Sequence, residues 1–232
     1  MNPWVKICAN TSLGDARLAA EAGADAVGFV FAEASRRRVT AAEVAAVTPH
    51  LPEEVEKIGV FVDASFEQIV STAQGCGLTG VQLHFNAPAE LAARLRERLG
   101  PQARIVSVIR FDAAAASGHA ALAALLAGDA HIDAVLVDTY AAAAAGGTGV
   151  AFDWGRARET LFQGLAARKH LILAGGLDPG NVAEAVQTLH PWGVDVASGV
   201  EAAPGRKDPV KVREFIVQAR TAFTSRAPAC NT

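Results

Sequence analysis

The stretch "HLILAGGLDPGNVAEAVQTLHPWGVDVASGV" (170–200) holds an apolar run, a glycine-rich loop, a segment with helical spacing and a second apolar run. The runs "HLILA" (170–174) and "VDVAS" (194–198) are short and bounded by turn residues, which is typical of strands buried in a parallel sheet. Between them, "NVAEAVQTLH" (181–190) has the apolar periodicity of a helix. We expect this helix to open near Asp178-Pro179, with proline just inside its start. The stretch therefore predicts a strand–helix–strand unit.

The same alternation extends through the rest of the chain. Further strands are predicted at "WVKIC" (4–8), "AVGFVF" (26–31), "KIGVFV" (57–62), "GVQLH" (80–84), "RIVSVI" (104–109) and "AVLVD" (134–138). Further helices are predicted at "DARLAAEAG" (15–23), "PAELAARLRERLG" (88–100) and "DPVKVREFIVQARTAF" (208–223). Gly23, Gly77 and Gly193 recur shortly before strands, which predicts helix C-caps followed by short loops.

Eight strands alternating with about eight helices predict an α/β protein with the (β/α)8 TIM-barrel fold. We expect a single barrel domain over residues 1–223 and a disordered tail over 224–232. A doubly wound sheet is the main alternative. It usually has fewer strands and a nucleotide fingerprint, but no G-x-G-x-x-G follows the first strand and the chain has no P-loop motif.

Composition narrows the class of protein. The chain has 232 residues, 51% hydrophobic residues and a net charge of −3, with no basic stripe that would favour nucleic acid. It shows no apolar stretch of membrane-spanning length and no signal peptide. Its three cysteines, Cys8, Cys76 and Cys230, are far apart, which argues against a disulfide framework. These features predict a cytoplasmic protein without a nucleic-acid or membrane partner.

In a barrel of this kind the active site lies at the C-terminal ends of the strands. Cys8 ends the first predicted strand, and strand alternation places it on the same face as Lys6. We expect Lys6 to pair with Asp195 inside the barrel, because a buried ammonium needs a partner. A nearby ammonium favours the thiolate, the form that acts as a base. The alternative reading of Cys8 is a buried small apolar residue.

Two other strand ends carry groups suited to chemistry. Asp138 ends an apolar strand, and a carboxyl group in such surroundings can serve as a general acid; the alternative is a cap. His84 ends another strand and is a candidate substrate-binding residue, with an ordinary core or loop histidine as the alternative. His84 has no second histidine, cysteine or carboxylate at metal-ligand spacing, so no metal site is expected.

Glycine-rich loops follow the last three predicted strands: "AGGTGVAFDW" (145–154), "LAGGLDPGNV" (173–182) and "ASGVEAAPGRKD" (197–208). Barrels frequently bind phosphate with the loops after strands 7 and 8, where backbone N–H groups can approach an anion closely. The candidate phosphate-binding residues are Gly147, Gly149, Gly175, Gly176, Ser198 and Gly199. In "EASRRRV" (33–39) one arginine could clamp a carboxylate, but spacing alone does not say which.

Taken together, "KIC", "GADAVGFVF", "GVFV", "VQLH", "GGTGVAFDW", "LAGGLDPGNV" and "DVASGVEAAPGRKD" resemble the phosphoribosylanthranilate isomerase family of tryptophan biosynthesis. The resemblance covers nearly the whole chain. It implies a one-domain TIM barrel of the ribulose-phosphate-binding type, a phosphosugar substrate, no cofactor, and a monomer or homodimer. It assigns the general base to Cys8, the general acid to Asp138 and the binding of the anthranilate carboxylate to Arg37.

The chain departs from the family pattern at a few positions. Ala9 stands where the family usually has glycine, and a positive φ there would strain alanine by about 1 kcal/mol. Asn10 replaces an apolar residue, Phe85 replaces a glycine near the mouth, and Arg36 replaces a proline. A diverged phosphosugar-binding barrel without this activity is therefore the alternative. An indoleglycerol-phosphate synthase would be expected to carry lysine in place of Cys8. A dual-substrate histidine/tryptophan isomerase would be expected to carry aspartate at the same position.

Overall fold

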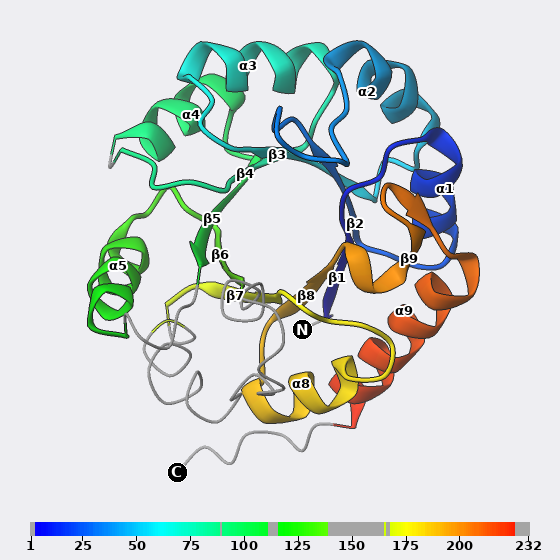
Figure 1. The fold of residues 1–232 in the computed structure, drawn as a ribbon. Helices are drawn as coiled ribbons and strands as arrows, with labels where there is room; N and C mark the ends of the chain where they lie inside the picture. The colour runs from blue at the N-terminus through cyan, green and yellow to red at the C-terminus, as the bar shows by residue number, and fades with distance from the viewer. Residues whose placement is uncertain (1–2, 89, 111–115, 139–164, 166–167, 226–232) are drawn as a thin grey trace.

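The computed structural model describes residues 3–88, 90–110, 116–138, 165 and 168–225, and within these ranges it confirms the predicted barrel (Figure 1). Eight parallel strands pair in sequence order and the ring closes between β8 and β1. The strands are β1 (Trp4–Ile7), β2 (Ala26–Val30), β3 (Glu56–Phe61), β4 (Gly80–Leu83), β5 (Arg104–Arg110), β6 (Ala134–Asp138), β7 (His170–Ala174) and β8 (Gly193–Val196).

The helices form the outer ring (Figure 1). They are α1 (Leu13–Glu21), α2 (Ala41–Val47), α3 (Phe66–Gly75), α4 (Leu91–Leu99), α5 (Ala116–Gly128), α8 (Val182–Leu189) and α9 (Pro209–Thr224), with short 3-10 turns η1 (Thr48–His50) and η5 (Ser198–Val200). A small hairpin of β9 (Glu201–Ala203) and β10 (Arg206–Lys207) follows η5. Within the described ranges, none of the helices combines the length and apolar character of a membrane span.

Strand alternation divides the core into two parts. In β1, Val5 and Ile7 are fully buried in the layer between sheet and helices, as predicted. Trp4 belongs to a smaller cluster inside the barrel, with Ile58, Leu136 and other inward residues. Lys6 also has no exposed surface. Along β1 the interior therefore changes from apolar at the N-terminal end to polar toward the C-terminal end, which prepares the position of a polar site.

The predicted glycine caps are confirmed at two of three positions. Gly23 and Gly77 have φ of 96° and 60°, the left-handed conformation in which glycine avoids a steric cost. The prediction for Gly193 is wrong, because this residue lies inside β8 and His190 (φ 52°) caps α8 instead. A Cβ at Gly193 would lie 2.7 Å from the Trp4 carbonyl oxygen, so close strand packing is the reason for glycine here.

The start of α8 also differs from the prediction. The helix begins at Val182 rather than near Asp178-Pro179. The Asp178 carboxylate instead accepts hydrogen bonds from the Gly180 and Asn181 amides, at 2.7 and 3.1 Å, and so forms a side-chain turn ahead of the helix. At the other end of the chain, residues 226–232 of the predicted tail lie outside the described residues, and the domain boundary stays a prediction.

Candidate active site

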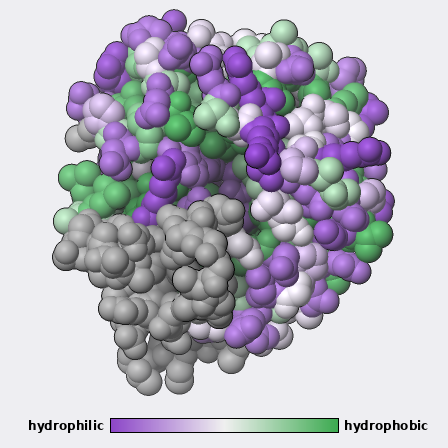
Figure 2. Space-filling view, viewed as in Figure 1, coloured by the Kyte–Doolittle hydropathy of each residue, from purple (hydrophilic) through white to green (hydrophobic). Residues whose placement is uncertain are grey.

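A cavity of about 420 Å³ opens at the C-terminal ends of the strands. Figure 2 shows the molecule hollowed at the centre of the ring, with hydrophilic residues on part of the rim. Of the predicted site residues, those that line the cavity are Cys8, Arg37, His84, Asp138, Gly175, Gly176 and Ser198. The predicted residues Gly147 and Gly149 lie outside the described residues. The cavity is large enough for a ligand of metabolite size.

A buried ion pair forms the floor of this cavity. The Lys6 ammonium donates to an Asp195 carboxylate oxygen at 2.8 Å and to the Gln82 side-chain oxygen at 2.6 Å, which confirms the predicted Lys6–Asp195 pair. Burial lowers the pKa of Lys6, but the Asp195 carboxylate and the Cys8 side chain more than offset it and hold the pKa above its ordinary value. Asp195 and Gln82 also line the cavity. The Asp195 carboxylate of this pair therefore faces the cavity, and the Lys6 ammonium lies beneath it.

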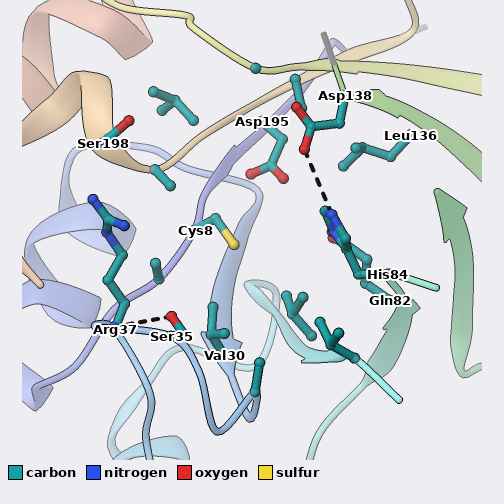
Figure 3. Close-up of a pocket in the computed structure, with 18 of the residues that line it drawn as sticks. Cys8, Val30, Ser35, Arg37, Gln82, His84, Leu136, Asp138, Asp195 and Ser198 are labelled. Carbon is teal, nitrogen blue, oxygen red and sulfur yellow. Dashed lines mark hydrogen bonds and ion pairs between the residues drawn. The ribbon is translucent and has the colours of Figure 1, made fainter. Parts of the chain in front are cut away.

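The Cys8 thiol follows β1 and points into the cavity (Figure 3). Its amide donates to the Val196 carbonyl at 2.8 Å, which extends the β1–β8 ladder by one residue. Space for the thiol comes from Gly28 on β2, where a Cβ would lie 2.6 Å from the Cys8 sulfur and 2.8 Å from the Lys6 Cε. Sequence reasoning missed Gly28, because its role depends on the β1–β2 register, in which Lys6 pairs with Ala26.

The Lys6 ammonium favours the thiolate, as expected, but it does not decide the direction of the overall pKa shift. Burial raises the pKa of the Cys8 thiol, and the Lys6 and Lys207 ammonium groups, which lower it, do not offset this effect. The Asp195 carboxylate adds to the rise. The ammonium is where the sequence predicted, but the low polarity of the site outweighs it. The neutral thiol is therefore the favoured form at neutral pH.

Ala9 has φ of 60°, as the comparison with the family's glycine anticipated. This left-handed conformation costs alanine about 1–2 kcal/mol. Asn10 holds the strained turn: its amide donates to the Gly28 carbonyl at 2.9 Å, and its side-chain NH₂ donates to the Ile7 carbonyl at 2.8 Å and the Gly28 carbonyl at 3.2 Å. The two departures from the family pattern therefore belong to one local arrangement, in which Asn10 fastens the turn that Ala9 strains.

Asp138 and His84 point toward each other as direct neighbours in the cavity lining (Figure 3). The Nε2 atom of His84 lies 3.7 Å from a carboxylate oxygen of Asp138, and its Nδ1 lies 3.5 Å from the Gln82 amide nitrogen. Burial lowers the pKa of His84, and the Asp138 carboxylate, which raises it, does not restore the ordinary value. A neutral His84 thus lies beside the predicted acid.

Phe85, which follows His84, packs against the hydrophobic core. It lines two neighbouring pockets and does not line this cavity.

The loops after β7 and β8 meet at the predicted phosphate position. Gly175 and Gly176 have φ of 89° and 65°, so glycine is required for this backbone path. Gly199 packs directly on the other loop, since a Cβ there would lie 1.8 Å from the Leu177 carbonyl oxygen. The sequence predicted these glycines as phosphate ligands, and the structure adds that Gly199 is needed for the two loops to touch.

Arg37 enters the cavity lining from the loop after β2. Its Nε and Nη2 donate to the two carboxylate oxygens of Glu201, each at 2.7 Å. Sequence reasoning did not single out Glu201, because 164 residues separate it from Arg37 and nothing local marks the pair.

Among the described residues, no group of three or more histidine, cysteine or acidic side chains could hold a metal ion.

Comparison with known proteins agrees with this geometry. A family model described as N-(5′-phosphoribosyl)anthranilate (PRA) isomerase matches residues 5–218. The chain is 43% identical over 212 residues to N-(5′-phosphoribosyl)anthranilate isomerase of Pelobacter propionicus, covering 91% of this chain and 93% of that protein. It is 44% identical over 216 residues to the Citrifermentans bemidjiense protein of the same name, covering 93% and 96%.

Solved structures give the same result. Phosphoribosyl anthranilate isomerase from Thermotoga maritima aligns with a TM-score of 0.77 at 33% identity, covering 94% of this chain and 99% of that chain. A structure of such an isomerase in complex with reduced 1-(o-carboxyphenylamino)-1-deoxyribulose 5-phosphate aligns with the same TM-score, identity and coverage. Another describes monomers generated from the dimeric Thermotoga maritima enzyme. The chain therefore belongs to the N-(5′-phosphoribosyl)anthranilate isomerase family, an enzyme family of tryptophan biosynthesis.

Proposed function

We propose that this protein converts N-(5′-phosphoribosyl)anthranilate to 1-(2-carboxyphenylamino)-1-deoxyribulose 5-phosphate, with Cys8 as general base and Asp138 as general acid. One observation carries the proposal: a single cavity is lined by the thiol that follows β1, a carboxyl group at the end of β6, an arginine and a pair of glycines after β7. These groups match the three parts of the substrate, which are a reacting sugar, a carboxylate and a phosphate. The predicted cytoplasmic location and monomeric or dimeric state stay predictions.

Binding would use the two ends of the substrate. Gly175 and Gly176 follow β7 at positive φ, where neither has a Cβ, and they line the cavity together with Ser198 after β8. The predicted residue Gly199 follows Ser198 but does not line the cavity. Backbone amides and a serine hydroxyl of this kind suit a phosphate group. Arg37 suits the carboxylate of the anthranilate ring, since a guanidinium pairs with a carboxylate through two parallel hydrogen bonds. Anchoring both ends holds the ribose between Cys8 and Asp138.

The reaction needs one proton donated and one removed. Asp138 gives its proton to the furanose ring oxygen, the bond from that oxygen to C1′ breaks, and the anthranilate nitrogen supplies the electron pair that forms a protonated Schiff base. The Cys8 thiol must first lose its proton to solvent. The resulting thiolate then takes the proton from C2′, and the released pair forms the C1′–C2′ double bond as electrons return to nitrogen. The resulting enolamine moves its hydroxyl proton to C1′ and becomes the ketose. Proton exchange with solvent afterwards returns Cys8 and Asp138 to their starting forms. Positioned acid and base groups suffice for such an isomerisation.

His84 contributes to this scheme through Asp138. Its ring lies 3.7 Å from the Asp138 carboxylate and lines the same cavity, which suits a neutral side chain that keeps the acid turned toward the sugar. The prediction that His84 contacts the substrate itself remains open to test. Substitution of His84 by alanine is expected to lower kcat more than it raises KM if orientation of Asp138 is its main role.

The test is the decay of anthranilate fluorescence when purified protein meets freshly generated phosphoribosylanthranilate. Rapid decay is expected for the unaltered protein, and a loss of at least about a hundredfold in kcat for Cys8→Ser and for Asp138→Asn. Cys76→Ser is the matched control, because Cys76 is a buried cysteine at the end of α3 that does not line the cavity. Near-native turnover by Cys8→Ser would refute the assignment of the base.

The same assay addresses the alternative of a diverged phosphosugar-binding barrel. The observation that favours it is the strained Ala9 directly after the proposed base. This alternative requires binding of a phosphosugar, measured by calorimetry with the reduced product analogue, together with no fluorescence decay. Turnover that depends on Cys8 excludes it.

A further inference from the structure

The Glu201 side chain lies behind Arg37 rather than in the cavity. It accepts both hydrogen bonds of a two-point contact from Arg37, each at 2.7 Å, and it does not line the cavity that Arg37 lines. The Glu201 side chain is 5% exposed and that of Arg37 26% exposed. The buried carboxylate therefore contacts the Nε–Nη2 edge of the guanidinium and does not itself line the cavity.

Further bonds fix Glu201 itself. Its carboxylate accepts from the Gly205 amide at 3.3 Å and lies 3.5 Å from the Lys207 ammonium, which has no exposed surface. Lys207 also donates to the Ala197 carbonyl at 3.0 Å, in the segment after β8. The Lys211 ammonium donates to the Glu201 carbonyl at 3.1 Å. The β9–β10 hairpin thus ties Arg37 to the loop that leads to Ser198 and Gly199.

The Glu201 carboxylate lies between two basic side chains. It accepts hydrogen bonds from Arg37 and lies 3.5 Å from the Lys207 ammonium. Burial raises the pKa of Glu201, but the hydrogen bonds from Arg37 and the charge of Lys207 outweigh it and hold the pKa below its ordinary value. The carboxylate therefore stays ionised at neutral pH.

Ordering an arginine side chain costs rotamer entropy. A partner that orders the side chain before the substrate arrives removes this cost from binding. Glu201 engages the Nε and Nη2 donors, which sets both the position and the plane of the guanidinium. Since Nη1 is the far corner of that plane, its direction follows from the same contact.

We propose that Glu201 is a positioning residue that orients Arg37 for the carboxylate of the substrate. The inference rests on the proposed function, in which Arg37 binds that carboxylate. The carboxylate is remote from the reacting carbon atoms, so its contact contributes equally to substrate and transition state. Loss of the positioning contact therefore raises KM and leaves kcat nearly unchanged.

The first measurement is steady-state kinetics of Glu201→Gln, which keeps the shape and removes the charge. We expect KM to rise roughly tenfold to a hundredfold, with kcat within about threefold of the unaltered enzyme. The double variant Glu201→Gln/Lys207→Met removes one charge of each sign. It replaces the single variant in the same kinetic measurement if Glu201→Gln folds poorly. Glu56→Gln is the matched control: Glu56 forms the same two-point contact with Arg104 at the start of β3, and neither residue lines the cavity.

Two further readouts separate positioning from a structural role. In an Arg37→Ala background, the Glu201→Gln change should add less than about threefold to KM, because a shared function is lost only once. The affinity ratio between the reduced product analogue and its counterpart without the ring carboxylate should fall in Glu201→Gln and stay unchanged in Glu56→Gln. This ratio does not respond to general destabilisation.

The outcomes are distinguishable. An unaltered enzyme that shows no turnover refutes the proposed function. Turnover together with an unchanged KM in Arg37→Ala refutes the role of Arg37, and with it the role of Glu201. Turnover, a raised KM in Arg37→Ala and an unchanged KM or unchanged affinity ratio in Glu201→Gln refutes the positioning role alone.

Discussion

Replacing Gly28 with alanine would test how closely the reaction depends on the position of the Cys8 thiol. The added Cβ would lie 2.6 Å from the Cys8 sulfur, 2.8 Å from the Lys6 Cε and 3.2 Å from the Cys8 Cα. Unbonded carbon atoms in contact are about 3.5–4.0 Å apart, and sulfur is no smaller, so the thiol must move by about 1 Å. A misplacement of 1 Å can cost about a hundredfold in rate. We therefore expect kcat to fall by roughly that factor.

The expected effect on stability is smaller. Overpacking a filled core costs about 1–3 kcal/mol, and replacing a strand glycine returns about 0.5–1 kcal/mol of that. For a domain of this size, Tm should fall by only a few degrees, at about 2–4 °C per kcal/mol. Gly75→Ala is the control, because a Cβ at Gly75 on α3 would meet no atom within 4 Å. A folded Gly28→Ala protein with near-native kcat would refute the reasoning.

Three further predictions follow from the same contacts. Because burial raises the pKa of Cys8 above its ordinary value of 9.0, kcat/KM should rise with pH between 7 and 9, and a flat profile would mean that the base is not this thiol. The raised pKa also means that the stability contributed by the neutral thiol is present below pH 9 and is lost as the pH rises further. Asp195→Asn should lower the free energy of unfolding by about 3–5 kcal/mol in urea titrations, because it leaves the Lys6 ammonium buried without its counter-charge; a loss below 1 kcal/mol would contradict this. Gly199→Ala should raise KM and weaken inhibition by inorganic phosphate, since its Cβ would lie 1.8 Å from the Leu177 oxygen and must push the loops apart.

Most of the fold could be predicted from the sequence because the pattern that marks each strand and each helix is local. The apolar runs and the helical segments each carry their own periodicity, and together they indicate a closed ring without any long-range information. The Lys6–Asp195 pair could be predicted for the same reason. Both residues lie on inward positions of adjacent strands, and a buried ammonium requires a partner.

The wrong predictions arose where two physical effects compete. Gly193 looked like a helix cap, but the loop was closed by His190 and the glycine was needed where β8 passes the Trp4 carbonyl. For Cys8 the sequence showed the neighbouring ammonium but not the depth of burial, which decides the direction of the pKa shift. In both cases the outcome depends on how close the surrounding atoms lie, and sequence spacing does not contain that distance.

The residues that sequence reasoning missed act through another residue. Gly28 determines where the Cys8 sulfur can lie, and Glu201 determines where the Arg37 guanidinium can lie. Neither has a chemical group that the reaction needs, so no catalytic motif points to them. Their importance comes from the register of β1 against β2 and from the fold of the β9–β10 hairpin. It follows that a barrel could keep Cys8, Asp138 and Arg37 and still lose rate or affinity through changes at Gly28 or Glu201. Activity in this family should therefore be judged on these supporting positions together with the reacting groups.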